Sequence, residues 1–252
     1  METGRNLIVV TGATGKQGGA TTRELLAKGH KVRAVTRKPD SPAAREIAKL
    51  GAEVVAGDLD DAASLERSLA GAWGVFAVQN TWEAGVEREE EQGKRIAEIA
   101  RRQGLQHYVY SSVASAHRNT GIPHFDNKWR VEEKVRALGI PSYTVLRPVF
   151  FMENLLLPSF LQGIQQGQLA VALEPATAEI LSRVAQHEVK FVQVPIEEVR
   201  KFSMDYALML EWFDRVGYDA DIAKASAESG IRPTPLATWA ATVDWEPARV
   251  TT

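Results

Sequence analysis

A glycine-rich turn between a strand-like run and a helix-like stretch is the feature that most constrains how this chain folds. Residues 7–11 read Leu-Ile-Val-Val-Thr, which is typical of a strand buried on both faces. The turn, Gly-Ala-Thr-Gly-Lys-Gln-Gly at residues 12–18, follows at once, and residues 20–28 have the leucine spacing of a helix that ends near Gly29. A strand, a tight turn and a helix in this order predict the first unit of a parallel α/β sheet.

The same alternation of apolar runs and helical stretches continues through the first 150 residues. Further strands are predicted at residues 31–36, 53–56, 74–78, 107–112 and 143–146. Six strands joined by helices predict a doubly wound Rossmann domain over residues 1–150.

Several helices between these strands have recognisable starts or faces. Ser41 followed by Pro42 predicts the start of one helix, and Asp60 is the expected cap of another. Longer helices are predicted over residues 86–102 and 127–138. The charge run at residues 87–91 is interpreted as the solvated face of the first of these two helices.

The pattern weakens beyond residue 150. Helices are expected over residues 154–166, 176–185 and 196–216, a single strand over 188–194, and an irregular tail from residue 230. Residues 151–252 are therefore predicted to form a small, mostly helical lobe of the kind that covers a substrate. Large apolar side chains recur at helical spacing within the helix expected over residues 196–216, and they are expected to form either core or a self-association face. They are Phe202, Tyr206, Leu210, Trp212 and Phe213.

Composition excludes several classes of function. The 252 residues include no cysteine, which excludes disulfides, zinc-thiolate sites and thiol nucleophiles. A net charge of -2 gives no electrostatic footprint for nucleic acid or an anionic membrane surface. The N-terminus lacks the regions of a signal peptide, so a cytoplasmic protein is expected. His117 and His124 have no further ligands at suitable spacing, and no metal site is predicted.

The turn at residues 12–18 has the features of a dinucleotide-binding site. Its glycines allow a tight turn, a close approach of the backbone to a pyrophosphate and close packing of the following helix. The N-terminus of that helix offers free N–H groups and the positive end of the helix dipole to phosphates. The alternative is a glycine-rich turn without a ligand, and the further βα units around the turn argue against it.

The end of the second strand indicates which dinucleotide fits. An NAD site usually places an acidic residue there, whereas an arginine accommodates the 2′-phosphate of NADP. This chain has Thr36-Arg37-Lys38 and no acid before Asp40, which favours NADP(H) over NAD(H). The alternative is that Arg37 and Lys38 are solvated loop charges. Asp58, after the third strand, is left open between a contact to the adenine and a turn residue.

A family resemblance rests on five stretches taken together. They are Thr11-Gly-Ala-Thr-Gly-Lys-Gln-Gly18, Val35-Thr-Arg37, Gly57-Asp58, His124-Phe-Asp-Asn-Lys128 and Phe151-Met-Glu-Asn-Leu155. This set resembles the NmrA-like family of atypical short-chain dehydrogenase/reductases, which is related to isoflavone reductases and to HSCARG-type NADPH sensors. The resemblance runs from Leu7 to about Leu173 and resumes from about Thr177.

The resemblance implies an NADP(H) site made by the glycine turn, the ends of the following strands and the start of the C-terminal lobe. The implied cofactor-binding residues are Gly12, Thr14, Gly15, Lys16, Gln17, Gly18, Arg37, Asp58, Gln79, Asn80, Ser111, Lys128, Phe151 and Asn154. Ser111 and Ser112 lie where many short-chain reductases keep a catalytic hydroxyl.

Two departures from the family pattern affect the expected chemistry. The tyrosine that active short-chain dehydrogenases place four residues before the lysine is His124 here, while Lys128 matches the lysine that isoflavone reductases use as general acid/base. Histidine is able to act as a general acid, although it does not recreate the usual dyad. The second departure is a missing strand-and-helix stretch, so the C-terminal lobe is expected to be shortened near residue 175.

Two functions are the main hypotheses, and a third alternative is a cofactor-binding remnant that the missing stretch after Pro175 has left inactive. The first is an NADPH-dependent reductase of a small carbonyl, quinone or enone, with Lys128 and His124 as the catalytic residues. The alternative is a redox-sensing regulator that binds NADPH and NADP+ without turnover and controls a partner protein. The expected partner is accordingly a small-molecule substrate or a regulated protein, and a homodimer is left open.

Overall fold

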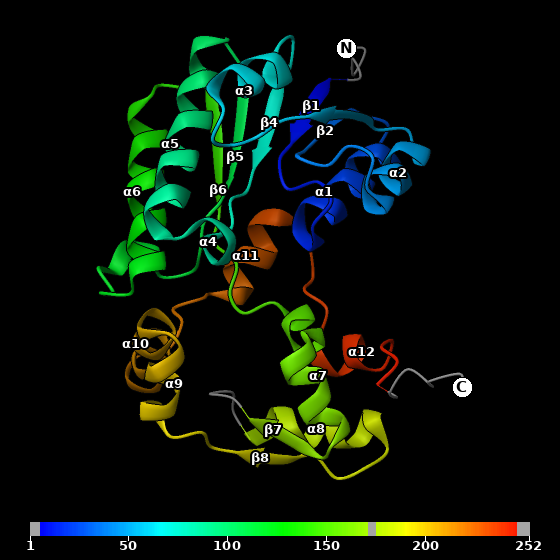
Figure 1. Cartoon of the computed structure of the whole chain (residues 1–252), viewed down its shortest axis with the longest axis vertical. Coiled ribbons are helices and arrows are strands. Elements are labelled where there is room, and N and C mark those ends of the chain that lie inside the picture. The colour runs from blue at the N-terminus through cyan, green and yellow to red at the C-terminus, as the bar shows by residue number, and fades with distance from the viewer. Residues whose placement is uncertain (1–5, 171–174, 246–252) are drawn as a thin grey trace. The chain divides into compact units, whose positions relative to one another are not determined.

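The computed structural model describes residues 6–170 and 175–245 of the chain (Figure 1). The chain divides into two compact units, Met1–Pro148 and Val149–Thr252. The shortening of the family pattern expected near residue 175 lies beside residues 171–174, which are outside the described residues, and it stays a prediction. Within the described ranges no helix has both the length and the apolar composition needed to cross a membrane.

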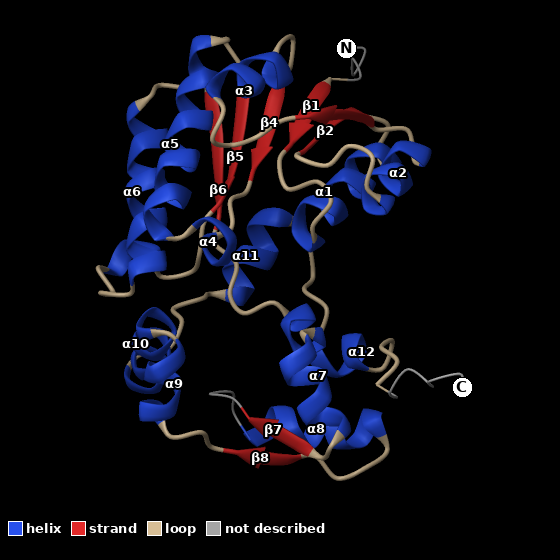
Figure 2. Cartoon of the chain, in the orientation of Figure 1, coloured by secondary structure: helices blue, strands red, loops and turns tan. Residues whose placement is uncertain are grey.

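The first unit contains a six-stranded parallel sheet with the order β3-β2-β1-β4-β5-β6 (Figure 2). Its strands are β1 (Leu7–Val10), β2 (Lys31–Thr36), β3 (Glu53–Ala56), β4 (Gly74–Ala77), β5 (His107–Ser111) and β6 (Ser142–Leu146). The strand order reverses between β1 and β4, and open sheets of this kind bind ligands at the carboxyl ends of the strands beside that reversal. The predicted doubly wound Rossmann fold is confirmed.

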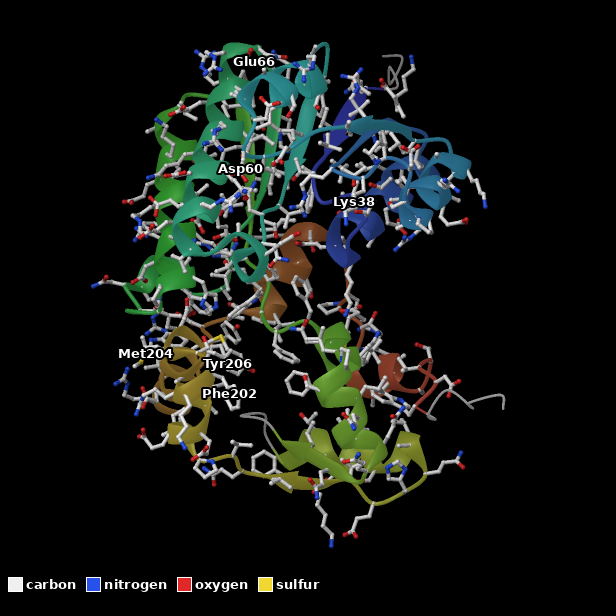
Figure 3. All side chains as sticks on the ribbon, in the orientation of Figure 1. Lys38, Asp60, Glu66, Phe202, Met204 and Tyr206 are labelled. Carbon is white, nitrogen blue, oxygen red and sulfur yellow. The ribbon has the colours of Figure 1, made fainter. Side chains whose placement is uncertain are left out.

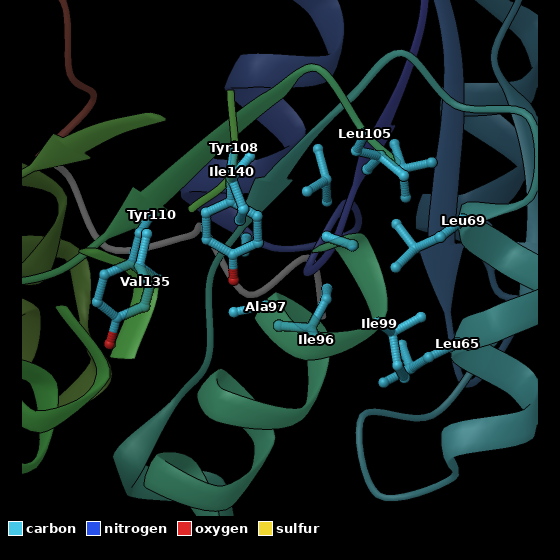
Figure 4. Packing of buried hydrophobic residues seen from close by; sticks show 14 of the residues in the cluster. Leu65, Leu69, Ile96, Ala97, Ile99, Leu105, Tyr108, Tyr110, Val135 and Ile140 are labelled. Atoms are coloured by element: carbon cyan, nitrogen blue, oxygen red, sulfur yellow. The ribbon is translucent and has the colours of Figure 1, made fainter. Parts of the chain in front are cut away.

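Helices connect these strands and cover both faces of the sheet. They are α1 (Lys16–Ala27), α2 (Pro42–Lys49), α3 (Ala62–Leu69), α4 (Thr81–Ala84), α5 (Val86–Arg102) and α6 (Pro123–Ala137), with a short 3-10 turn η1 (Ala116–Arg118). The larger core cluster joins the sheet to α3, α5 and α6 (Figure 4). It includes Tyr108 and Tyr110 from β5, Leu65, Ile96 and Val135. Burying each such aliphatic side chain contributes roughly 1.5–3 kcal/mol.

A second core cluster lies on the opposite face, where α1 and α2 pack. Val32 and Ala34 of β2 contact Ile47 of α2, and Leu25 and Leu26 of α1 pack against them. Because both faces of the central strands are covered, those strands read as continuous apolar runs. This is why β1, with its run of branched side chains, was recognisable from sequence.

Three helix starts in this unit differ from the sequence-based expectation, and one of them is α6, which begins at Pro123 rather than at residue 127. Helix α1 begins at Lys16, so Gly18 and Gly19 lie inside its first turn. Asp61, rather than Asp60, caps α3 by accepting a 2.9 Å hydrogen bond from the Ala63 amide. Asp60 is available for other contacts because its neighbour already satisfies the helix end.

The second unit is mostly helical, as predicted. Its elements are η2 (Met152–Leu156), α7 (Pro158–Gln165), β7 (Gln168–Ala170), α8 (Pro175–Ala185), β8 (Lys190–Val192), α9 (Ile196–Phe202), α10 (Met204–Arg215), α11 (Ile222–Ser229) and α12 (Leu236–Ala240). Strands β7 and β8 pair in parallel as a small separate sheet. Leu155, Ile164, Leu181 and Trp245 belong to the core of this unit.

Two helices expected as continuous are divided in the structure. Pro158 begins α7 and separates it from η2, because proline favours the first helical position. Ser203 separates α9 from α10, and its hydroxyl accepts a 3.1 Å hydrogen bond from the Tyr206 amide. The apolar set at this place also divides, since Trp212 is buried whereas Phe202, which is labelled in Figure 3, is 91% exposed.

Candidate functional site

The glycine turn leaves β1 and enters α1 with backbone contacts that exclude side chains. Gly12 has a φ of +59°, which favours glycine. A Cβ on Gly18 would lie 2.4 Å from the Gly12 oxygen and 2.7 Å from the Thr11 oxygen. A side chain at position 18 would clash with the end of β1, so only glycine allows helix α1 to start this close to the strand. Such close packing is what a dinucleotide turn requires.

The outer side of the same turn is open. Thr14, Gly15 and Lys16 are exposed, and the cap residue Gly15 has no side chain to satisfy the first amides of α1. The N–H groups at the start of a helix and the positive end of its dipole favour an anion at such a place. The chemistry of the turn thus fits a pyrophosphate.

The inner side of the turn is fixed by side-chain hydrogen bonds to two other strands. The Thr11 hydroxyl donates to the Val78 carbonyl at 3.0 Å and accepts from the Val78 amide at 2.9 Å. The Ser111 hydroxyl, at the end of β5, donates to Oε1 of Gln17 at 2.9 Å. Gln17 and Ser111, both predicted cofactor contacts, are therefore brought together, and they hold the turn against the carboxyl edge of the sheet.

Arg37 follows β2 at the same edge. Its guanidinium forms an ion pair with the carboxylate of Glu83 on α4, and the two side chains are 58% and 54% exposed. The hydrogen bond and the charge of Glu83 raise the pKa of Arg37 above its usual value, and the charges of Asp58 and Asp60 add to the effect. Sequence alone did not reveal Glu83 as a partner of this arginine.

The side chain of Asp58 takes part in a turn. Its Oδ1 accepts a 2.9 Å hydrogen bond from the Asp60 amide, and its own amide donates to the Ser64 hydroxyl at 3.0 Å. Of the two alternatives from sequence, the turn role is the one seen here, and the contact to adenine stays a prediction.

The residues after β4 have local partners. Asn80 caps α4, because its Oδ1 accepts a 3.1 Å hydrogen bond from the Trp82 amide. The amide of Gln79 is buried and has no hydrogen-bond partner within the described residues. A Cβ on Gly93 of α5 would lie 3.5 Å from Gln79 Oε1, so this side chain lies over α5. A contact from either residue to a nicotinamide ribose stays a prediction.

Lys128 lies on α6 and faces a buried carboxylate. Its Nζ is 2.5 Å from Oε1 of Glu89 on α5, and the side chains of Lys128 and Glu89 are only 12% and 2% exposed. The second carboxylate oxygen accepts hydrogen bonds from Asn127 Nδ2, at 2.8 Å, and from the Thr81 hydroxyl. Three donors from α4 and α6 therefore meet at one carboxylate.

The prediction that residues 87–91 form a solvated face is wrong for Glu89. Glu89 stands on the same side of α5 as the buried residues Gly93, Ile96 and Ala100, at the 3.6-residue spacing of a helix. Extending that apolar face back by one turn would have placed Glu89 inside. The charge run hid it because Glu87, Arg88 and Glu91 around it are exposed.

His124, at the start of α6, is packed among aromatic rings. Its ring centroid lies 5.2 Å from that of Trp82 and 4.9 Å from that of Phe125, in an edge-on arrangement with the latter. The imidazole is buried, one helical turn from Lys128. A part in proton transfer stays a prediction for His124.

A second buried carboxylate, Glu132, anchors the end of β5 and the end of β6 to α6. It accepts a 2.6 Å hydrogen bond from the Ser112 hydroxyl and further ones from Arg136 and Arg147. Burial alone would raise the pKa of Glu132, but the hydrogen bonds from Arg147, Ser112 and Arg136 outweigh it and hold the pKa below its usual value. Ser112 is thereby engaged in a structural contact.

Phe151 and Asn154, the remaining predicted cofactor contacts, belong to the second unit. Both lie at η2, where Phe151 is the cap residue and is exposed. Their contact with a cofactor stays a prediction.

The comparison with protein families identifies a match over most of the chain. The NmrA-like family model matches residues 4–178. The NmrA-like family domain-containing oxidoreductase malD of Malbranchea aurantiaca is 35% identical over 176 residues, covering 65% of this chain and 52% of the relative. Another such oxidoreductase, FrzB of Cladobotryum sp, is 35% identical over 161 residues, which are 60% of this chain and 48% of FrzB. The chain spans about half the length of the curated relatives it matches.

Solved structures share the fold at low identity. The Citrobacter sp. triphenylmethane reductase complexed with NADP(H) is 19% identical with a TM-score of 0.74, over 92% of this chain and 98% of the reductase. NmrA, a negative transcriptional regulator, in complex with NADP is 20% identical with a TM-score of 0.72, over 95% of each chain. At these identities the likeness establishes the fold. Together with the family match over residues 4–178, more than half of the sequence, it shows that this chain belongs to the NmrA-like family.

Proposed function

We propose that this chain binds NADP(H) and reduces a small carbonyl, quinone or enone. The observation that carries the proposal is the ammonium of Lys128, held 2.5 Å from the buried carboxylate of Glu89 in the unit that also contains the glycine turn. A fixed ammonium is a suitable proton donor for a substrate oxygen. When bound, the nicotinamide would supply the hydride to the substrate carbon.

The residues of the first unit fit this cofactor. The open outer side of the glycine turn suits the pyrophosphate, and Arg37 suits a 2′-phosphate because its planar fork forms paired hydrogen bonds with phosphate oxygens. Two proteins of the same fold, the triphenylmethane reductase and NmrA, have been crystallised with NADP(H) or NADP. The NADPH-dependent quinone oxidoreductase from Escherichia coli, complexed with NADPH, is also similar, with a TM-score of 0.74.

The chain's own side chains would act on the proton side of the reaction. The oxygen of a bound carbonyl substrate would gain negative charge as its carbon is reduced, and it would take a proton from the Lys128 ammonium, leaving the neutral amine. Glu89 then acts as a positioning residue, because Asn127 and Thr81 hold its Oε2 while its Oε1 accepts from the lysine and so fixes the direction of the ammonium. His124, one turn away, is the second candidate for supplying the proton.

The test combines NADPH binding with turnover. NADPH consumption is followed by absorbance with a panel of quinones, enones and small carbonyls, for the wild type and for Lys128→Met. Loss of a positioned general acid is expected to lower kcat by about 10²–10⁴-fold. Calorimetry with NADPH shows whether the variant is folded and still binds. The double variant Lys128→Met/Glu89→Gln is the second test. If the loss of turnover came only from the unpaired buried charge of Glu89, the double variant would recover turnover.

The matched control is Lys134→Met. Lys134 lies on the same helix and pairs with Glu98, and both side chains are partly exposed. This substitution removes the same charge away from the proposed site, and turnover is expected to stay at the wild-type level. Unchanged turnover in Lys128→Met would remove Lys128 from the mechanism.

A second function, NADPH sensing without turnover, is favoured by one observation. His124 takes the place of the usual tyrosine and lies buried between Trp82 and Phe125. Sedimentation with NADPH and with NADP+ tests it. A sensor is expected to change its self-association or its partner binding between the two forms and to consume no NADPH with any substrate of the panel. Turnover that depends on Lys128 would decide for the reductase.

A further inference from the structure

The ion pair between Arg37 and Glu83 joins two segments of the chain that flank the end of β1. Arg37 follows β2 and Glu83 lies on α4, which follows β4. Since β2 and β4 are the two neighbours of β1 in the sheet, the pair spans the carboxyl end of β1, where the glycine turn begins. The strand order reverses here, which is the place at which open α/β sheets bind their ligands.

Three carboxylates act on the guanidinium of Arg37. Glu83 is hydrogen-bonded to the guanidinium, and Asp58 and Asp60 act on it through their charge. A carboxylate and a phosphate both recognise the fork of N–H donors on an arginine. A 2′-phosphate that binds Arg37 must therefore displace Glu83 from the guanidinium or share it, at the cost of two anions in contact.

We propose that Glu83 is a specificity-determining residue that competes with the 2′-phosphate of NADP(H) for Arg37. The inference rests on the proposed NADP(H) binding. The fraction of molecules in which Arg37 is not paired with Glu83 sets the apparent affinity for NADPH. NADH has no 2′-phosphate, so its affinity does not depend on this competition. Arg37 favours NADPH over NADH, and Glu83 reduces this difference in affinity.

The backbone around Glu83 allows the exchange. Helix α4 is only four residues long, and Gly85, with a φ of +84°, separates it from α5. Both members of the pair are more than half exposed, so the bond is open to water and salt. Exchange of a carboxylate for a phosphate at this arginine needs only a movement of side chains and of one short turn.

The experiment measures the affinities of NADPH, NADH and 2′,5′-ADP by calorimetry, for the wild type and for Glu83→Gln. Glu83→Gln is expected to tighten NADPH and 2′,5′-ADP by about three- to five-fold, the range that an exposed ion pair supports. The affinity for NADH is expected to change by less than about two-fold, since the competing group on the ligand is missing. The gain in NADPH affinity from Glu83→Gln is expected to shrink at 0.5 M salt, where exposed charges are screened.

Two controls separate competition from a general charge effect. Glu87→Gln removes the same charge from an exposed site in the first turn of α5 and is expected to leave all three affinities unchanged. In an Arg37→Gln background, Glu83→Gln is expected to have no effect on NADPH, because the group competed for is gone.

The outcomes distinguish this inference from the proposed function. If the wild type binds neither NADPH nor 2′,5′-ADP, the proposed NADP(H) binding fails and the inference falls with it. If the wild type binds NADPH but Glu83→Gln binds it no more tightly, or more weakly, the competition is overturned while the proposed function stands. Equal tightening of NADPH and NADH would likewise overturn it, as a general charge effect.

Discussion

The ammonium of Lys128 and the carboxylate of Glu89 lie 2.5 Å apart, and neither is more than 12% exposed. An ion pair of this kind makes each partner dependent on the other. Removing one charge leaves its partner buried in a poorly solvating surrounding, which costs more than removing both.

The first prediction follows from this dependence. Lys128→Met is expected to lower the free energy of unfolding by about 3–5 kcal/mol at pH 7, because it strands the buried Glu89 carboxylate. Lys128→Met/Glu89→Gln is expected to recover most of that loss. Urea unfolding of the wild type and both variants gives the comparison. A double variant no more stable than the single one would mean that the stranded charge is not the cause.

The second prediction concerns the close approach at the glycine turn. Gly18→Ala is expected to destabilise the first unit by several kcal/mol and to abolish dinucleotide binding, because the added Cβ would meet three backbone atoms at 2.4–2.7 Å. Gly19→Ala is the control, since its Cβ would meet the Ala13 oxygen at 3.2 Å and its helical position favours alanine. Thermal unfolding and calorimetry of the two variants check it. Equal losses in both would show that the close contact of Gly18 with the end of β1 is not the cause.

The third prediction is a pH dependence set by Glu132. Hydrogen bonds from Arg147, Ser112 and Arg136 overcome the effect of burial and lower its pKa in the folded protein. The unfolded chain has a glutamate pKa of about 4.3. The contribution of this carboxylate is therefore present above that pH and is lost as the pH falls through the lower, folded pKa.

Glu132→Gln is accordingly expected to lower stability at pH 7 and to reduce the further loss between pH 5 and the acid range. Urea unfolding at a series of pH values measures both effects. Glu98→Gln, which removes a more exposed carboxylate paired with Lys134, serves as the control and is expected to follow the wild type. A Glu132→Gln curve parallel to the wild type would contradict the role of this carboxylate.

The fourth prediction separates two aromatic residues of the second unit. Trp212 is 5% exposed and Phe202 91% exposed, although both belong to one apolar pattern in the sequence. Trp212→Ala is expected to cost about 3–5 kcal/mol, and Phe202→Ala less than about 0.5 kcal/mol, in the free energy of unfolding. Fluorescence-monitored urea unfolding distinguishes them. A large loss from Phe202→Ala would indicate that this side chain is covered in solution.

The Rossmann fold was predictable because its signals are local. A strand such as β1 is a run of branched residues, the turn after it is marked by glycines, and Ser41-Pro42 marks the start of α2. The second unit was less predictable because its elements are short. Strand β7 has three residues, and the break at Ser203 depends on one hydroxyl that caps α10.

The candidate site was predictable where the backbone carries it, and incomplete where partners come from distant elements. Lys128 was found through the family resemblance of the stretch His124–Lys128, but its partner Glu89 lies 39 residues away within a run of charges. Arg37 was found by its place after β2, whereas Glu83 lies 46 residues further on. No local pattern joins such pairs, because the sheet order that brings them together is a property of the whole domain.

The close approach of Gly18 to Gly12 has a consequence for how sites of this kind diversify. The part of the turn suited to the pyrophosphate is built from main-chain atoms, which every amino acid shares, so its shape depends on the glycines and on the few side chains that hold the turn, those of Thr11, Gln17 and Ser111. The proposed choice between cofactors rests instead on single side chains at loop ends, Arg37 and Glu83. One or two nucleotide changes are enough to alter such a choice, while the inherited scaffold stays the same.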